Sequence, residues 1–124
     1  MISLASAAKR FLPPAVVMAT IFLLSHQPRG VLPLPALLGL DKLAHLVVYG
    51  LLAASIIRAF GERMCQLRPG RVVTIAILWC LAYGLSDEFH QSFVPGRSPS
   101  GLDVLADTVG AFIVGIVWLF RHDR

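Results

Sequence analysis

Four long apolar segments, separated by short polar stretches, dominate this chain of 124 residues. They cover residues 11–25, 43–60, 72–86 and 102–120. A helix needs about 20 residues to cross a bilayer, with a range of roughly 17 to 25. The second and fourth segments reach that length alone, and the other two reach it with their flanking residues.

We therefore predict an all-α fold: an integral membrane four-helix bundle, with one domain over residues 1–124. The spans are expected at about residues 11–26, 42–60, 71–90 and 102–120. Three spans, without the first, is the alternative. A basic start before an apolar run is also typical of a signal peptide. Pro13 and Pro14 interrupt that run early, and residues 25–28 lack a small-x-small cleavage pattern, so we expect a retained helix.

The composition agrees with a membrane environment. The chain is 56% hydrophobic and only 15% charged, whereas soluble domains carry about 25% charged residues. Disorder would require low hydrophobicity and a high net charge. We expect the lipid bilayer to be the main partner and expect no nucleic-acid partner. Pairs of small residues four apart, such as Gly50 with Ala54 and Ala106 with Gly110, would allow close helix packing, and the sequence leaves room for oligomerisation.

The positive residues predict an orientation, because Lys and Arg accumulate in cytoplasmic loops. Three lie on one side of the predicted bundle: Arg29, Lys42 and Arg97. Eight lie on the side that holds the termini and the connection between the second and third segments: Lys9, Arg10, Arg58, Arg63, Arg68, Arg71, Arg121 and Arg124. Both termini should therefore be cytoplasmic.

The polar and ionisable groups of the spans gather at the opposite, extracytoplasmic end. They come from three segments and one connection: Asp41, Lys42, His45, Tyr49, Asp87, Glu88, His90, Gln91, Arg97, Asp103 and Asp107. Residues four apart share a helix face. An ionisable group inside a span costs about a few kcal/mol if it faces lipid. We expect these side chains to turn inward, toward one another or a water-filled pocket.

This mixture of side chains suits several kinds of chemistry. For catalysis, His45 or His90 would be a general base oriented by Asp41 or Asp87, and Arg97 would hold a phosphate. The catalytic candidates are His45, His90, Asp87 and Glu88. No residue context marks a nucleophile. Asp41 and Asp103 would also suit the first turns of helices in a purely structural network.

A metal site is a further hypothesis, since His, Asp and Glu side chains are suitable ligands. The chain shows no standard ligand pair within a helix. Glu88-x-His90, for example, does not place both side chains on one helix face. We therefore expect no metal and no cofactor.

The same strings resemble the VanZ-like family, small bacterial membrane proteins named for an accessory gene of glycopeptide-resistance clusters. The strings are Asp41-Lys42-x-x-His45-x-x-x-Tyr49, Asp87-Glu88-x-His90-Gln91-x-Phe93-x-Pro95-x-Arg97 and Asp103-x-x-x-Asp107-x-x-Gly110, and Ser25-x-Gln27 fits the end of the first helix. The resemblance covers about residues 20–118. It implies a four-helix membrane domain and, for the founding members, a link to teicoplanin tolerance, but no known reaction. Asp107 departs from the pattern, since members commonly carry Asn there.

The segments, the charge distribution and the resemblance together lead to the hypothesis of a multi-pass protein of the bacterial cytoplasmic membrane. Its extracytoplasmic pocket would bind a lipid-linked or phosphate-bearing head-group ligand of the cell envelope. The expected ligand-binding residues are Asp41, His45, Tyr49, Asp87, Glu88, His90, Gln91, Arg97, Asp103 and Asp107. One alternative is a membrane enzyme acting on a phospholipid or lipid-linked envelope substrate, with His90 or His45 as the general base. The other is a purely structural polar network.

Overall fold

The computed structural model describes residues 3–28 and 40–124, and this part of the chain is helical without any strand. Arg29, counted above among the extracytoplasmic charges, lies outside it. The described residues form α1 (Leu4–Ser25), α2 (Leu40–Ala59), α3 (Glu62–Leu67), α4 (Pro69–Gln91) and α5 (Gly101–His122). All except α3 are long and apolar enough to cross a membrane. The prediction of an all-α protein with four such helices is confirmed.

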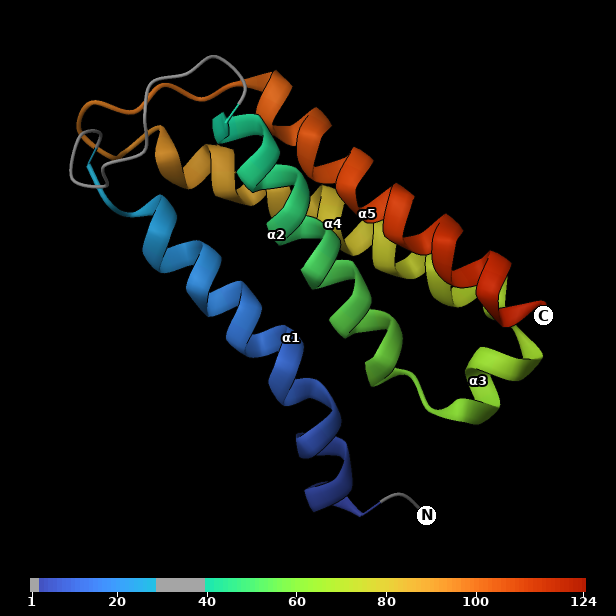
Figure 1. Cartoon of the computed structure of the whole chain (residues 1–124). Helices are drawn as coiled ribbons and strands as arrows, with labels where there is room; N and C mark the ends of the chain where they lie inside the picture. Colours follow the sequence, from blue (N-terminus) through green and yellow to red (C-terminus); the bar gives the residue numbers. More distant parts are fainter. Residues whose placement is uncertain (1–2, 29–39) are drawn as a thin grey trace.

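The bundle is built around α2, α4 and α5 (Figure 1). The most extensive contact joins α2 to α5, and α4 packs mainly on α5. Helix α1 lies along α2 and is the least buried of the four long helices. The core between the helices is apolar and includes Leu52, Ala53, Ile57, Val72, Ala76, Cys80 and Ala111.

Glycine determines how closely α2 and α5 approach each other. A Cβ atom added to Gly110 would overlap the backbone carbonyl oxygen of Leu46. Gly50 lies at the same crossing, where its Cβ position is 3.5 Å from the carbonyl oxygen of Gly110. In an apolar solvent, such small residues let helix backbones pack directly against one another.

The outer surface of the bundle is strongly apolar. Large side chains on all four long helices are more than half exposed, among them Phe11, Leu51, Leu78 and Phe112. A monomeric soluble protein rarely exposes so much contiguous apolar surface. Such a surface is consistent with helices that are long and apolar enough to cross a membrane.

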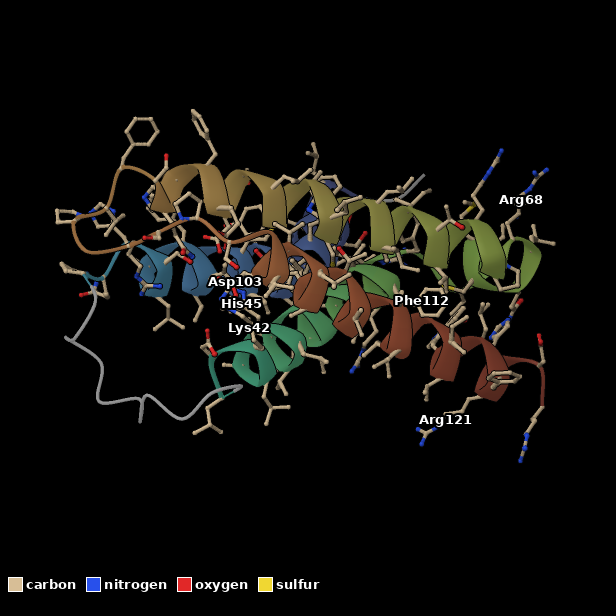
Figure 2. All side chains as sticks on the ribbon, turned by 90° about the horizontal axis from the view of Figure 1, so that it is seen from above. Lys42, His45, Arg68, Asp103, Phe112 and Arg121 are labelled. Atoms are coloured by element: carbon tan, nitrogen blue, oxygen red, sulfur yellow. The ribbon has the colours of Figure 1, made fainter. Side chains whose placement is uncertain are left out.

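The two ends of the bundle differ in charge. Both termini lie toward the end that holds α3 (Figure 1), and the Arg10 guanidinium lies against Gly61 in the α2–α3 connection. Arg68 and Arg121 are at this end, whereas Lys42, His45 and Asp103 lie near the other (Figure 2). The basic residues and the polar cluster are thus separated along the bundle.

The short helix α3 occupies a connection that the sequence analysis treated as a basic loop. Gly61 precedes it in an extended conformation, and Glu62 places a negative charge in its first turn. An acid at that position interacts favourably with the helix dipole. Pro69 then begins α4 at a position where its missing N–H has no intrahelical partner to lose.

Candidate functional site

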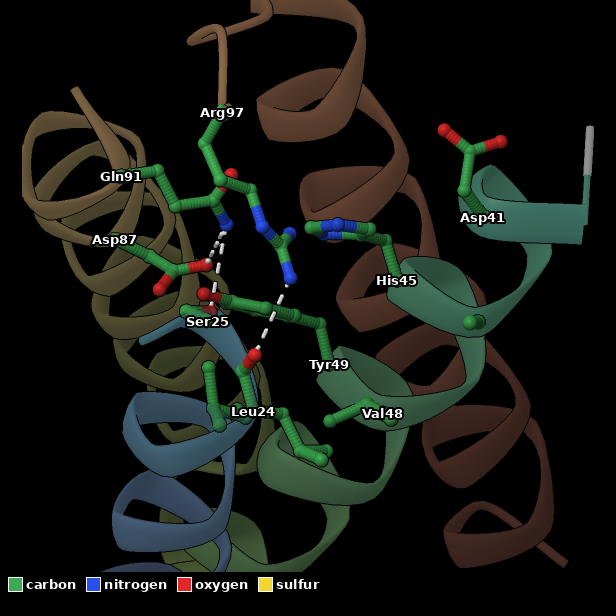
Figure 3. Close-up of a pocket in the computed structure, with 11 residues that line it drawn as sticks. Leu24, Ser25, Asp41, His45, Val48, Tyr49, Asp87, Gln91 and Arg97 are labelled. Carbon is green, nitrogen blue, oxygen red and sulfur yellow. Dashed lines mark hydrogen bonds between the residues drawn. The ribbon is translucent and has the colours of Figure 1, made fainter. Parts of the chain in front are cut away.

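A cavity of about 150 Å³ lies between α1, α2, α4 and the α4–α5 connection (Figure 3). Apolar side chains of α1 and α2 form part of its wall. Six of the ten predicted ligand-binding residues line it: Asp41, His45, Tyr49, Asp87, Gln91 and Arg97. The helices therefore bring together residues that are far apart in the sequence.

Gln91 connects α4 to α1 at one side of the cavity. Its Nε2 donates to Asp87 Oδ2 at 3.3 Å, one turn earlier on α4, and to Ser25 Oγ at 3.4 Å (Figure 3). All three side chains are buried. Buried polar groups are costly unless they are hydrogen-bonded, so these bonds hold Asp87 in position at the pocket wall.

Arg97 reaches the cavity from the α4–α5 connection. Gly96, with a φ of 76°, allows the turn just before it. Arg97 Nε donates to the carbonyl oxygen of Gln27 at 3.0 Å and Nη2 donates to that of Leu24 at 3.3 Å. Gln27 lies just beyond α1, and the Leu24 carbonyl also accepts a hydrogen bond from the Gln27 backbone N–H at 3.3 Å. Within residues 3–28 and 40–124, Arg97 forms no ion pair with a carboxylate.

Tyr49 brings a hydroxyl group to the cavity from α2. The residue is only 1% exposed, and its hydroxyl oxygen has no hydrogen-bond partner among the described residues. A buried hydroxyl without a partner is energetically unfavourable. Tyr49 also lines the cavity.

A second polar group joins α2 to α5 beside the cavity (Figure 2). Lys42 Nζ bonds to Asp103 Oδ1 and to Asp41 Oδ2, the latter at 2.9 Å. His45 Nδ1 lies 2.7 Å from Asp107 Oδ1, and His45 Nε2 lies 3.9 Å from Asp103 Oδ2. Asp103 and Asp107 are both buried. Asp103, Asp107 and His45 are turned inward as expected, whereas the Asp41 side chain is 58% exposed.

Glu88 extends this group from α4. Its Oε2 accepts a hydrogen bond from the Ser100 backbone N–H at 2.7 Å, immediately before α5 begins. Its Oε1 has no partner among the described residues, although Glu88 is only 6% exposed. Ligand atoms of His45, Glu88 and Asp103 all lie within 4.8 Å of one another.

His90 lies apart from this carboxylate group. Its ring stacks on Phe22 of α1 with 4.5 Å between ring centroids, and its Nε2 lies 3.1 Å from His26 Nδ1. The two predicted general bases therefore have different surroundings. His45 is oriented by Asp107 rather than by Asp41, whereas His90 shares no hydrogen bond with Asp87 among the described residues.

Two residues matter more than their sequence context indicated. Lys42, on the polar string but outside the predicted ligand set, is the ion-pair partner of Asp103. Gly84 makes room for Asp107, because an added Cβ would lie 2.8 Å from Asp107 Oδ2. A glycine within an apolar span is common, so no local signal distinguishes Gly84 before the helix packing is known.

The chain was compared with protein-family models, curated proteins and solved structures. The family model described as VanZ/LLP1 matches residues 9–122. No curated protein matches the chain, and no solved structure does. The matched range contains every residue of the pocket and of the carboxylate group described above.

Proposed function

The chain belongs to the VanZ/LLP1 family, and we propose that its pocket binds a phosphate-bearing head group of an envelope lipid or lipid-linked molecule. The position of Arg97 carries this proposal. Its guanidinium is held at the cavity by the carbonyls of Leu24, in α1, and Gln27, just beyond it, and has no acidic partner among the described residues. A guanidinium presents its N–H groups in a fork that matches phosphate geometry.

The size of the cavity favours a head group over a larger molecule. Its volume of about 150 Å³ is below the roughly 300–1,000 Å³ that is usual for drug-sized ligands. Its wall also includes apolar side chains, such as Ile21 and Val48. In this proposal the head group enters the pocket while the hydrocarbon chains stay along the apolar outer surface of the bundle.

The other polar groups of the pocket narrow the chemistry. Asp41 and Asp87 would repel a simple anion, but they would accept hydrogen bonds from an amine or hydroxyl group. The unpartnered hydroxyl of Tyr49 adds a donor or acceptor. The proposed ligand therefore carries amine or hydroxyl groups beside its phosphate. The role in teicoplanin tolerance that the family resemblance implies would act through such an envelope ligand.

The proposal places the pocket on the extracytoplasmic side of the bacterial cytoplasmic membrane, with both termini inside. Cysteine labelling in spheroplasts tests this orientation. Burial and the nearby Glu62 carboxylate raise the pKa of the Cys65 thiol, which slows its reaction with maleimide. Cys65→Ser removes the labelling of Cys65 that remains. In the Cys65→Ser protein, Ser98→Cys should react with a membrane-impermeant maleimide. A cysteine replacing Arg124 should react only after the membrane is disrupted, and the reverse pattern would invert the proposed orientation.

The head-group proposal is tested with short-chain phosphatidylethanolamine added to the purified full chain in detergent. We expect saturable binding that raises the melting temperature, and none with a diacylglycerol of the same chain length. Arg97→Gln should weaken binding about 10- to 100-fold, since hydrogen bonds to charged groups contribute about 1.5–3 kcal/mol. The matched control is Arg121→Gln at the opposite end of the bundle, which should bind as the parent does.

Two outcomes would argue against this proposal. One is equal binding of the phosphate lipid and diacylglycerol, because phosphate recognition would then be absent. The other is an equal effect of Arg97→Gln and Arg121→Gln, which would indicate nonspecific attraction between the lipid and positive residues. Preference for undecaprenyl phosphate over phosphatidylethanolamine would instead identify a lipid-linked carrier as the ligand.

A membrane enzyme with His45 as general base is the second candidate function. The hydrogen bond between His45 Nδ1 and Asp107 favours it, because a carboxylate that orients an imidazole is a common arrangement in acid–base catalysis. His90 has no such partner among the described residues. Release of a water-soluble product from the same lipids, lost in His45→Gln and kept in His90→Gln, would support catalysis over binding alone.

A further inference from the structure

Among the described residues, the polar end of the bundle has more carboxylates than permanent cations. The permanent cations described there are Lys42 and Arg97. Its carboxylates are Asp41, Asp87, Glu88, Asp103 and Asp107, four of which are buried. Burying carboxylates in a low-dielectric region is unfavourable unless positive charge compensates them. Among the described residues this compensation is incomplete, so a bound cation would stabilise the cluster.

Three side chains at the polar end of the bundle converge from three different helices. His45 comes from α2, Glu88 from α4 and Asp103 from α5, with ligand atoms within 4.8 Å of one another. Ligands about 2.1 Å from a tetrahedral ion lie about 3.4 Å apart. Side-chain movements that shift the ligand atoms by roughly an ångström would bring the three groups to that spacing without moving the helices.

The histidine is already oriented as a metal ligand usually is. His45 Nδ1 bonds to Asp107 at 2.7 Å, and its Nε2 faces Asp103 Oδ2 at 3.9 Å. Histidines that bind metals almost always use the second ring nitrogen to contact a carboxylate, carbonyl or water, which fixes the ring and the tautomer. Asp107 has this position relative to His45.

Glu88 supplies an independent observation. It is 6% exposed, and its Oε1 has no hydrogen-bond partner among the described residues, while Oε2 is held by the Ser100 N–H. Asp103 is similarly divided, with Oδ1 bonded to Lys42 and Oδ2 directed toward His45. Each carboxylate is therefore anchored through one oxygen and has the other oxygen available.

We propose that His45, Glu88 and Asp103 bind a divalent cation such as Zn²⁺ or Mn²⁺, which accept mixed nitrogen and carboxylate ligands. This site does not depend on the head-group proposal. It departs from the sequence-based expectation of no metal, which considered ligand pairs within one helix. Ligands contributed singly by three helices leave no such spacing.

The experiment uses the full chain, purified without a polyhistidine tag, treated with EDTA and then titrated with Zn²⁺ alone. We expect one Zn²⁺ per chain and a higher melting temperature. His45→Gln and Glu88→Gln should each weaken binding more than about 100-fold, beyond the 10- to 100-fold usual for an outer-shell partner. His90→Gln is the matched control, and its Zn²⁺ affinity should stay within about twofold of the parent.

A measurement on the parent protein covers the case in which these variants do not fold. X-ray absorption of the Zn²⁺-loaded chain should show imidazole nitrogen and oxygen ligands. Sulfur ligands, from Cys65 or Cys80, would overturn the proposal. So would the lack of saturable binding of both Zn²⁺ and Mn²⁺ at one ion per chain, or an equal loss in His90→Gln, which would indicate an adventitious ion only.

Discussion

Gly110→Ala should lower the free energy of unfolding of the bundle by about 3 kcal/mol, at the upper end of typical overpacking effects. The new Cβ would overlap the carbonyl oxygen of Leu46, and the carbonyl carbon and Cα of Leu46 would lie only 2.9 and 3.0 Å away. These are backbone atoms, so no side-chain rotation can relieve the overlap. Helices α2 and α5 would have to separate along their most extensive contact.

Thermal or denaturant unfolding in detergent measures this effect, and the chain supplies matched controls. An added Cβ at Gly70 or Gly101 would meet nothing within 4 Å. Gly70→Ala and Gly101→Ala should leave stability unchanged or raise it by about 0.5–1 kcal/mol, because alanine loses less conformational freedom on folding. If Gly110→Ala is as stable as these controls, α2 and α5 are not in the close contact described.

The same substitution should also disturb the polar site. Lys42 and His45 on α2 meet Asp103 and Asp107 on α5 across this interface. Ion pairs and hydrogen bonds weaken steeply with distance. Gly110 thus links the packing of the bundle to the geometry of the site.

The sequence predicted the four long helices and the gathering of polar residues at one end because both depend on local composition. Long apolar segments must be helical in lipid, where each backbone polar group needs an internal partner. Helical periodicity also indicated that His45 and Asp107 turn inward. The short helix α3 was missed because its six residues are too few to show a helical period.

The partners of these side chains could not be predicted in the same way. Pairing between helices depends on their relative rotation and height, which no spacing within one segment encodes. His45 accordingly meets Asp107 rather than Asp41, and His90 turns toward α1. Arg97 interacts with carbonyls at and just beyond the end of α1, an interaction that depends on where that helix ends.

Asp107 provides the second large expected effect. Asp107→Ala should lower the free energy of unfolding by about 3–5 kcal/mol, because it removes a partner from a buried pair and leaves His45 Nδ1 without its acceptor. Asp107→Asn keeps an acceptor oxygen for His45 and replaces the unpartnered Oδ2 beside Gly84 with a neutral amide. The free energy of unfolding of Asp107→Asn should be the same as that of the parent or up to about 1 kcal/mol higher.

Unfolding of both variants in detergent with EDTA separates a functional site from a purely structural network. If Asp107→Asn is at least as stable as the parent, the carboxylate is maintained at some cost in stability, which is common at functional sites. If Asp107→Asn loses as much stability as Asp107→Ala, the negative charge itself holds α2 to α5. The polar cluster would then be explained by helix packing, and the head-group and metal proposals would rest on their binding measurements alone.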